Sequence, residues 1–226
     1  SDQDYGVAYA LYTDYMKTFP DGRDAYDMGY YFAELLMTLQ KWGKAADHYE
    51  RIIQLKPKGE HSRDAAGSAV VAYKKLLNIK SRKSIDSVGD QDGKEIPKPK
   101  KIDGPRRKFI EANQRYLGYV RGQSMETDIN YDVALIYFDN NHFDEAVPRF
   151  KKIAEEKPSH ELAIYAANYL LDSFVLLKDY DKLNAQAATL MGRYSSENHP
   201  AFHARLVKIK QNATFNKCRG IEGKGD

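Results

Sequence analysis

The sequence predicts an all-α protein built from repeated pairs of helices, with one long insert that lacks a helical pattern. The first observation is in residues 128–158, where two stretches carry apolar side chains at helical spacing, joined by a short polar turn and closed by Pro158. The second is that residues 26–57 repeat this arrangement. Two amphipathic helices alone cannot hide both apolar stripes from water, so such units need neighbours of their own kind.

The two units match at eight positions that carry the same kinds of side chain. Alanine lets two helices approach closely, an aromatic side chain fills the space beside it, and proline ends the helix. We therefore expect the matched positions to form the core of each pair. They are Phe32, Ala33, Leu36, Trp42, Ala45, Tyr49, Ile52 and Pro57 in the first unit, against Val133, Ala134, Tyr137, Phe143, Ala146, Phe150, Ile153 and Pro158 in the second.

The rest of the chain divides into further helices of the same two kinds. Residues 5–19 match the second helix of a repeat whose first helix is missing, so we expect the array to begin in mid-repeat. Pro200 suits the first turn of a capping helix. Beyond the two aligned units, the expected helices are 5–19, 62–77, 106–120, 162–177, 180–194 and 200–215.

An insert separates one expected helix from its partner. Residues 78–105 are poor in apolar side chains and rich in Lys, Asp, Gly and Pro, so they cannot bury enough surface to offset the entropy of ordering. We expect them to form a mobile, disordered loop inside the repeat made by 62–77 and 106–120. The expected organisation is an N-terminal array at 1–77, the flexible insert at 78–105, a C-terminal array with its cap at 106–215, and a flexible tail at 216–226.

The set of small, aromatic and proline positions resembles the tetratricopeptide repeat (TPR). The resemblance implies a solenoid of helical hairpins in a right-handed superhelix, with the first helices forming the concave wall. The 37-residue period from Pro20 to Pro57 and the junction at residues 15–22 resemble the bacterial cell-envelope branch, which includes the Tol–Pal coordinator and the barrel-assembly lipoprotein. Residues 141–168 also resemble large TPR proteins of deltaproteobacteria. These likenesses imply an envelope scaffold, periplasmic and linked to motility or surface assembly, while a cytoplasmic location stays open.

The TPR resemblance also assigns a partner-binding groove on the first helices. Its aromatic and acidic side chains would suit an extended or helical peptide with apolar and basic side chains. The tyrosines could instead pack between repeats, and both interpretations stay open. Tyr30 and Tyr131 stand at the lysine positions of the family's carboxylate clamp, so a C-terminal carboxylate is not the expected ligand. The groove positions are Asp27, Tyr30, Glu34, Met37, Asp128, Tyr131, Leu135, Phe138, Tyr165, Asn168, Asp172 and Val175.

A basic stretch in the insert offers an alternative function. It could contact membrane phosphates, nucleic acid or an acidic partner, or it could be a solvated linker. No aromatic residues interleave it until Phe109, so a stacking platform for single strands is not indicated. Its basic residues are Lys94, Lys98, Lys100, Lys101, Arg106, Arg107 and Lys108.

Composition and motifs argue against other classes of function. The net charge is only +3, the one cysteine excludes an internal disulfide, and no apolar run or signal-peptide pattern indicates membrane insertion. No nucleophile motif, phosphate loop or carboxylate pair appears, so we expect no catalysis and no cofactor. His199 and His203 would share a helix face, but two histidines alone do not predict a metal site. We therefore expect a non-catalytic protein-interaction scaffold that is part of a larger protein.

Overall fold

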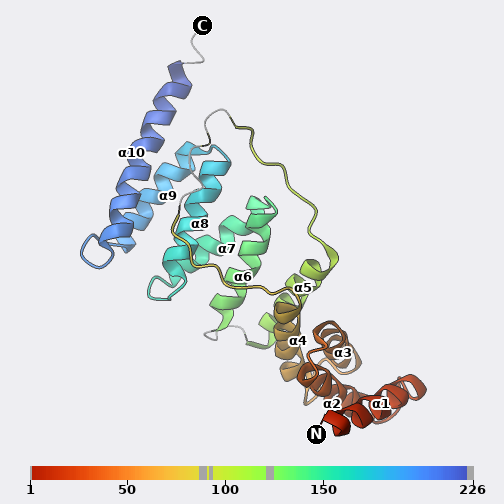
Figure 1. Cartoon of the computed structure of the whole chain (residues 1–226). Helices are drawn as coiled ribbons and strands as arrows, with labels where there is room; N and C mark the ends of the chain where they lie inside the picture. The colour runs from red at the N-terminus through yellow and green to blue at the C-terminus, as the bar shows by residue number, and fades with distance from the viewer. Residues whose placement is uncertain (1, 87–90, 92–93, 121–124, 223–226) are drawn as a thin grey trace. The chain divides into compact units, whose positions relative to one another are not determined.

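The chain folds into successive α-helices joined mostly by short turns (Figure 1). The computed structural model describes residues 2–86, 91, 94–120 and 125–222, and no strand occurs among them. The helices are α1 (Asp2–Thr18), α2 (Ala25–Thr38), α3 (Trp42–Leu55), α4 (Ser62–Leu76), α5 (Gly104–Val120), α6 (Met125–Asp139), α7 (Phe143–Glu156), α8 (Ala163–Leu176), α9 (Tyr180–Arg193) and α10 (Pro200–Glu222). This architecture confirms the predicted all-α class of paired helices.

The helices belong to two compact units, and residues 81–101 of the insert are part of the second. Unit 1 consists of Ser1–Lys80 and Ile102–Glu126, whereas unit 2 consists of Ser81–Lys101 and Thr127–Asp226. The chain therefore leaves unit 1 after α4, contributes the insert to unit 2, and returns to unit 1 for α5. It enters unit 2 a second time within α6.

Unit 1 is held together by contacts between successive helices from α1 to α5. Ala33 of α2 and Ala45 of α3 are completely buried, and so is the Tyr49 ring beside them. Gly29 has a similar role, because a Cβ atom there would lie 2.7 Å from Cδ1 of Ile52. The helices α4 and α5 pack against each other although the insert separates them in the sequence. Small residues thus allow the close approach that the aligned pattern predicted.

Unit 2 repeats this construction around packed aromatic rings. Successive helices from α7 to α10 are in contact, and α6 joins them through the rings of Tyr131 and Phe150, whose centroids lie 5.9 Å apart. Phe150 also stacks on Tyr169 of α8 at 5.5 Å. Ala134 and Ala146 are completely buried, as their counterparts are in unit 1.

Four first helices end in the same backbone motif. The residues that follow them have φ angles between 49° and 60°, in the left-handed region, although none is glycine. After each, the next N–H donates to the carbonyl five positions earlier, as in a Schellman cap. The motif recurs at the same place in each pair, which is independent evidence for a repeat. The left-handed residues are Gln40, Asn78, Asn141 and Lys178.

The insert and the C-terminus differ from the sequence-based expectation. Two parts of the insert, residues 81–86 and 98–100, make hydrogen bonds to unit 2, so they are not a free loop. The reason is polar pairing, which a count of apolar side chains does not capture. Residues 216–222 are helical because α10 continues to Glu222, and residues 223–226 lie outside the described part of the chain. Across the described residues, no helix is both long and apolar enough to cross a bilayer.

Candidate partner-binding walls

The predicted groove residues of unit 2 lie on α6 and α8, and each is buried or half-buried. Tyr131 and Asn168 are completely inaccessible to solvent, whereas Asp128, Phe138, Tyr165 and Val175 are half-buried. Leu135 and Asp172 are 5% and 2% exposed. For Tyr131 and Asn168, part of the covering comes from the chain's own residues Ser81–Asp86, which we call the seated segment. We use the name unit-2 wall for the residues that contact it: Tyr131, Asp132, Asp139, Glu161, Asn168 and Tyr169.

The wall binds the main chain of the seated segment at two points. The Tyr131 hydroxyl donates to the carbonyl of Arg82, and Nδ2 of Asn168 donates to the carbonyl of Asp86 at 3.1 Å. Burial raises the pKa of Tyr131 above its usual range, so this hydroxyl keeps the proton that it donates. Contacts of this kind recognise an extended backbone whatever side chains it carries.

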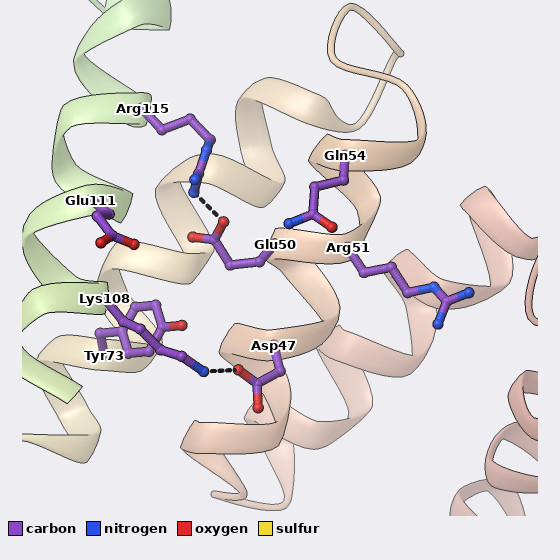
Figure 2. A pocket seen from close by; sticks show the side chains of 8 residues that line it. All are labelled: Asp47, Glu50, Arg51, Gln54, Tyr73, Lys108, Glu111 and Arg115. Carbon is purple, nitrogen blue, oxygen red and sulfur yellow. Dashed lines mark hydrogen bonds and ion pairs between the residues drawn. The ribbon is translucent and has the colours of Figure 1, made fainter. Parts of the chain in front are cut away.

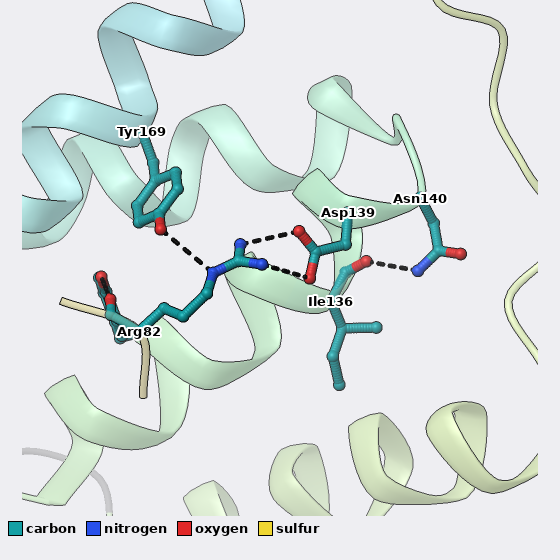
Figure 3. A network of polar contacts seen from close by, with 6 residues as sticks. Arg82, Ile136, Asp139, Asn140 and Tyr169 are labelled. Atoms are coloured by element: carbon teal, nitrogen blue, oxygen red, sulfur yellow. Dashed lines mark hydrogen bonds and ion pairs between the residues drawn. The ribbon is translucent and has the colours of Figure 1, made fainter. Parts of the chain in front are cut away.

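Arg82 makes the densest set of side-chain contacts (Figure 3). Its guanidinium binds both carboxylate oxygens of Asp139, at 2.8 and 3.3 Å, and its Nε donates to the Tyr169 hydroxyl at 3.2 Å. The guanidinium also lies 5.4 Å from the centroid of the Tyr169 ring. Partial burial disfavours the charged form, but the hydrogen bonds and charge of Asp139 more than offset this and raise the pKa of Arg82. A bidentate pair beside an aromatic ring is a geometry that arginine satisfies and lysine does not.

The neighbouring positions add two polar contacts. Ser81 donates its hydroxyl to Asp132 at 2.7 Å, and the ammonium of Lys83 lies 2.6 Å from a carboxylate oxygen of Glu161. Glu161 belongs to the turn before α8. The basic half of the seated segment therefore lies opposite three carboxylates of the wall.

At the other end of the seated segment an amide, a carboxylate and a guanidinium lie together. Asn168 bonds both the Asp86 carbonyl and, at 3.2 Å, the Asp172 carboxylate. Arg205 of α10 lies 3.9 Å from Asp172, and both of its terminal nitrogens are buried without a hydrogen-bond partner. Burial lowers the pKa of Arg205, while the charges of Asp172 and Asp86 act in the opposite direction. An arginine of α10, beside the Asp172 carboxylate, therefore lies behind the residue that bonds the acidic end of the segment.

A second part of the insert contacts the turn between α6 and α7. The amide of Lys100 donates to the Asn140 carbonyl at 2.9 Å, and Asn141 donates to the carbonyl of Lys98 at 2.9 Å. Nε2 of His142 lies 2.8 Å from the Lys100 carbonyl, which can only accept, so this nitrogen carries the proton. These contacts use the backbone of the basic stretch rather than its charges.

The basic residues of the insert do not form one free cationic surface. Arg106 pairs with Asp103, and Lys108 lies 2.9 Å from Asp47. Lys94 also has an interaction partner. The side chains of Lys98, Lys100, Lys101 and Arg107 are exposed, and the stretch is divided between the two units after Lys101.

The predicted groove residues of unit 1 contact mainly His61 and Tyr49. The Tyr30 ring stacks on the His61 ring with centroids 4.2 Å apart and planes 4° from parallel. Asp27 lies 3.3 Å from Nε2 of the same histidine, and Glu34 accepts a hydrogen bond from Tyr49 at 2.5 Å. Met37 is half-buried. We use the name unit-1 wall for Asp27, Tyr30, Glu34, Met37 and His61.

Unit 1 also holds a polar pocket of about 250 Å³ between α3, α4 and α5 (Figure 2). Glu50 pairs there with Arg115, and Lys108 with Asp47. Burial raises the pKa of Glu50 although the Arg115 charge opposes this. These pairs join α5 to α3 across the insert, so the pocket has a structural explanation. Its lining residues are Asp47, Glu50, Arg51, Gln54, Tyr73, Lys108, Glu111 and Arg115.

The histidine pair near the C-terminus has packing partners. Nδ1 of His203 lies 2.8 Å from the Tyr194 carbonyl, and the His199 ring meets the Tyr194 ring edge to face at 5.4 Å. Within the described residues, no cluster of three or more His, Cys, Asp or Glu side chains could hold a metal ion.

Sequence reasoning missed four residues of the unit-2 wall: Asp132, Asp139, Glu161 and Tyr169. Two of them lie at helix ends: Asp139 is the last residue of α6, and Glu161 belongs to the turn before α8. The groove assignment considered only inward positions on first helices. A signal was available for Asp139, because a carboxylate beside the polar turn at 139–142 is a ready partner for an arginine.

The fold and these walls define a helical-repeat protein whose first helices hold an extended segment. No protein-family model matches the chain, and no curated protein matches it in sequence. Among solved structures, the MamA protein is similar over 87% of this chain and 86% of that chain, with 13% sequence identity and a TM-score of 0.47.

Proposed function

We propose that this protein is a non-catalytic interaction scaffold whose unit-2 wall binds an extended segment of another protein. The observation that carries the proposal is the capture of two backbone carbonyls by Tyr131 and Asn168. Backbone recognition supports binding of any chain that can lie extended on this wall, with side-chain contacts supplying selectivity. The buried, packed helices beneath the wall preform it, which lowers the entropic cost of binding.

The proposal also covers the cellular location of the protein and the kind of partner it binds. The TPR resemblance of the sequence favours a partner in the bacterial cell envelope, and cell fractionation tests that part directly. The carboxylates of the wall favour a partner segment with basic side chains. The basic stretch 94–108 carries no second proposal, since Arg106 and Lys108 already have carboxylate partners and the backbone at Lys98 and Lys100 is used within unit 2.

Site-specific photo-crosslinking tests the proposal. A benzoylphenylalanine at Tyr165, which is half-buried on α8, would lie beside the wall. The control position is Thr189, which is exposed on α9. We expect a partner peptide to be crosslinked from position 165 and not from position 189, with mass spectrometry locating the crosslink in one continuous segment of the partner. Equal labelling from both positions, or none from position 165, would contradict the proposal.

A further inference from the structure

The seated segment is held by polar contacts and buries little apolar surface. Arg82 and Lys83 keep 48% and 43% of their side chains exposed. Ile85, the one large apolar residue of the segment, is 44% exposed. Exposed ion pairs contribute little each and weaken with salt, and each net hydrogen bond adds only a modest amount. Such a segment can lie on the wall in the free protein and still be displaced.

The charged residues around the seated segment also determine the N-to-C direction in which a segment can bind. The acidic partners Asp139 and Glu161 lie opposite the start of the segment. At its end, Asn168 bonds both the Asp86 carbonyl and Asp172, and Asp172 lies 3.9 Å from Arg205. An extended chain running the other way would place its basic residues near a buried guanidinium and its carboxylate near Asp139. The wall therefore selects both the charge pattern and the polarity of the segment it binds.

We propose, on the basis of the function proposed above, that the seated segment is a built-in competitor that mimics the partner. The partner then presents an extended segment with the pattern Arg-Lys-x-x-Asp, the pattern of residues 82–86 in this chain. Binding requires the seated segment to leave. The measured affinity is consequently reduced by the fraction of molecules in which the wall is covered.

A peptide with the sequence of residues 79–86, labelled with fluorescein, is the probe. Its binding to the full chain is measured by fluorescence anisotropy for the wild type, Arg82→Glu and Arg82→Glu/Asp139→Arg. Arg82→Glu repels Asp139 and releases the seated segment but leaves the wall intact for the probe. We expect this variant to bind the probe about tenfold more tightly than the wild type. The double variant restores the pair with reversed charges, so its affinity for the probe should fall to the wild-type level or below it.

Two controls separate this effect from general electrostatics and from misfolding. Lys98→Glu makes the same change in net charge at an exposed side chain of the insert, and it should leave probe affinity unchanged. A probe with Glu in place of its arginine should not bind Arg82→Glu. Circular dichroism and thermal melting check the fold, and Lys83→Glu is a milder variant that loses only the exposed pair with Glu161 and should tighten probe binding about twofold.

The outcomes distinguish this inference from the proposed function. Equal probe binding by the wild type and a folded Arg82→Glu variant would overturn the competitor role but would leave the wall as a binding surface. No probe binding by any variant, together with a partner crosslinked at position 165, would overturn the inferred charge pattern alone. Failure of both the probe and the crosslink would overturn the proposed function as well.

Discussion

Tyr30 and Tyr131 occupy equivalent positions in two repeats, yet their surroundings differ. Tyr30 is half-buried in unit 1, where its ring stacks on His61. Tyr131 is completely buried in unit 2, where its hydroxyl binds the backbone of the seated segment. The ring of His61, the residue just before α4, covers Tyr30. The seated segment, which is distant in the sequence, covers Tyr131. The comparison teaches that the inward face of a first helix can be covered in two ways. Either a nearby side chain packs on it, or an extended segment of chain binds to it.

The largest expected difference between the two walls is in stability. Tyr131→Ala should lower the free energy of unfolding by about 3–5 kcal/mol, because it leaves a cavity among Phe150, Tyr169 and the seated segment. Tyr30→Ala should cost only about 1–2 kcal/mol, because that ring is half-exposed. Urea denaturation followed by circular dichroism measures both. Equal losses of unfolding free energy in the two variants would contradict the difference between the two walls.

Alkaline pH should expose the contribution of buried tyrosines in unit 2. Burial raises the pKa of Tyr194 to about 12, and its hydroxyl donates to the Ala154 carbonyl. A raised folded-state pKa means that the neutral form is favoured by folding. Its contribution is therefore fully present below pH of about 10 and is lost as pH rises to about 12, by up to about 2–3 kcal/mol.

Tyr194→Phe tests this contribution. Between pH of about 10 and 12, the free energy of unfolding of the variant should fall less steeply with pH than that of the wild type, because phenylalanine does not titrate. Denaturation midpoints measured across that pH range give the slope. An unchanged slope would show that the Tyr194 hydroxyl does not couple to folding.

The backbone contact to the seated segment should have a smaller, separable effect. Tyr131→Phe keeps the ring but removes the hydrogen bond to the Arg82 carbonyl, so it should cost about 1 kcal/mol. It should also tighten binding of the residue 79–86 probe less than Arg82→Glu does, because the variant weakens the wall for the probe too. A loss as large as that of Tyr131→Ala would mean that the hydroxyl, rather than the ring, dominates.

The smallest expected effect concerns the left-handed cap residues. Lys178→Gly should raise the free energy of unfolding by about 0.5 kcal/mol, because glycine adopts a positive φ without steric cost. Asn141→Gly is the matched variant in the same unit. It should bring no gain, because the Asn141 side chain donates to the Lys98 carbonyl. Equal gains at both positions would remove the support for that contact.

The sequence predicted the helices and their cores closely, because both depend on local periodicity and on small residues at fixed spacing. Ala45 and Ala146, aligned from sequence, are both completely buried. The left-handed caps were not predicted, because Gln40 and Lys178 give no glycine signal. They are imposed by the packing of each hairpin.

The seating of the insert could not be predicted by the same reasoning. Arg82 reaches Asp139 and Tyr169 across 57 and 87 residues of sequence, and such polar contacts leave no periodic trace. The low apolar content of 78–105 predicted a loop without helical pattern, and the described residues 79–86, 91 and 94–103 are not helical. It did not indicate that backbone carbonyls and charges would hold parts of the segment on a helical wall.

Nitrogen-15 relaxation of the backbone amides of residues 82–86 in the free 226-residue chain tests the central claim most directly. If the seated segment lies on the unit-2 wall, order parameters there should approach the rigid value of about 0.85, and they should fall on addition of the residue 79–86 probe. Values below about 0.6 in the free protein would mean that the segment is a free loop, and would contradict the account.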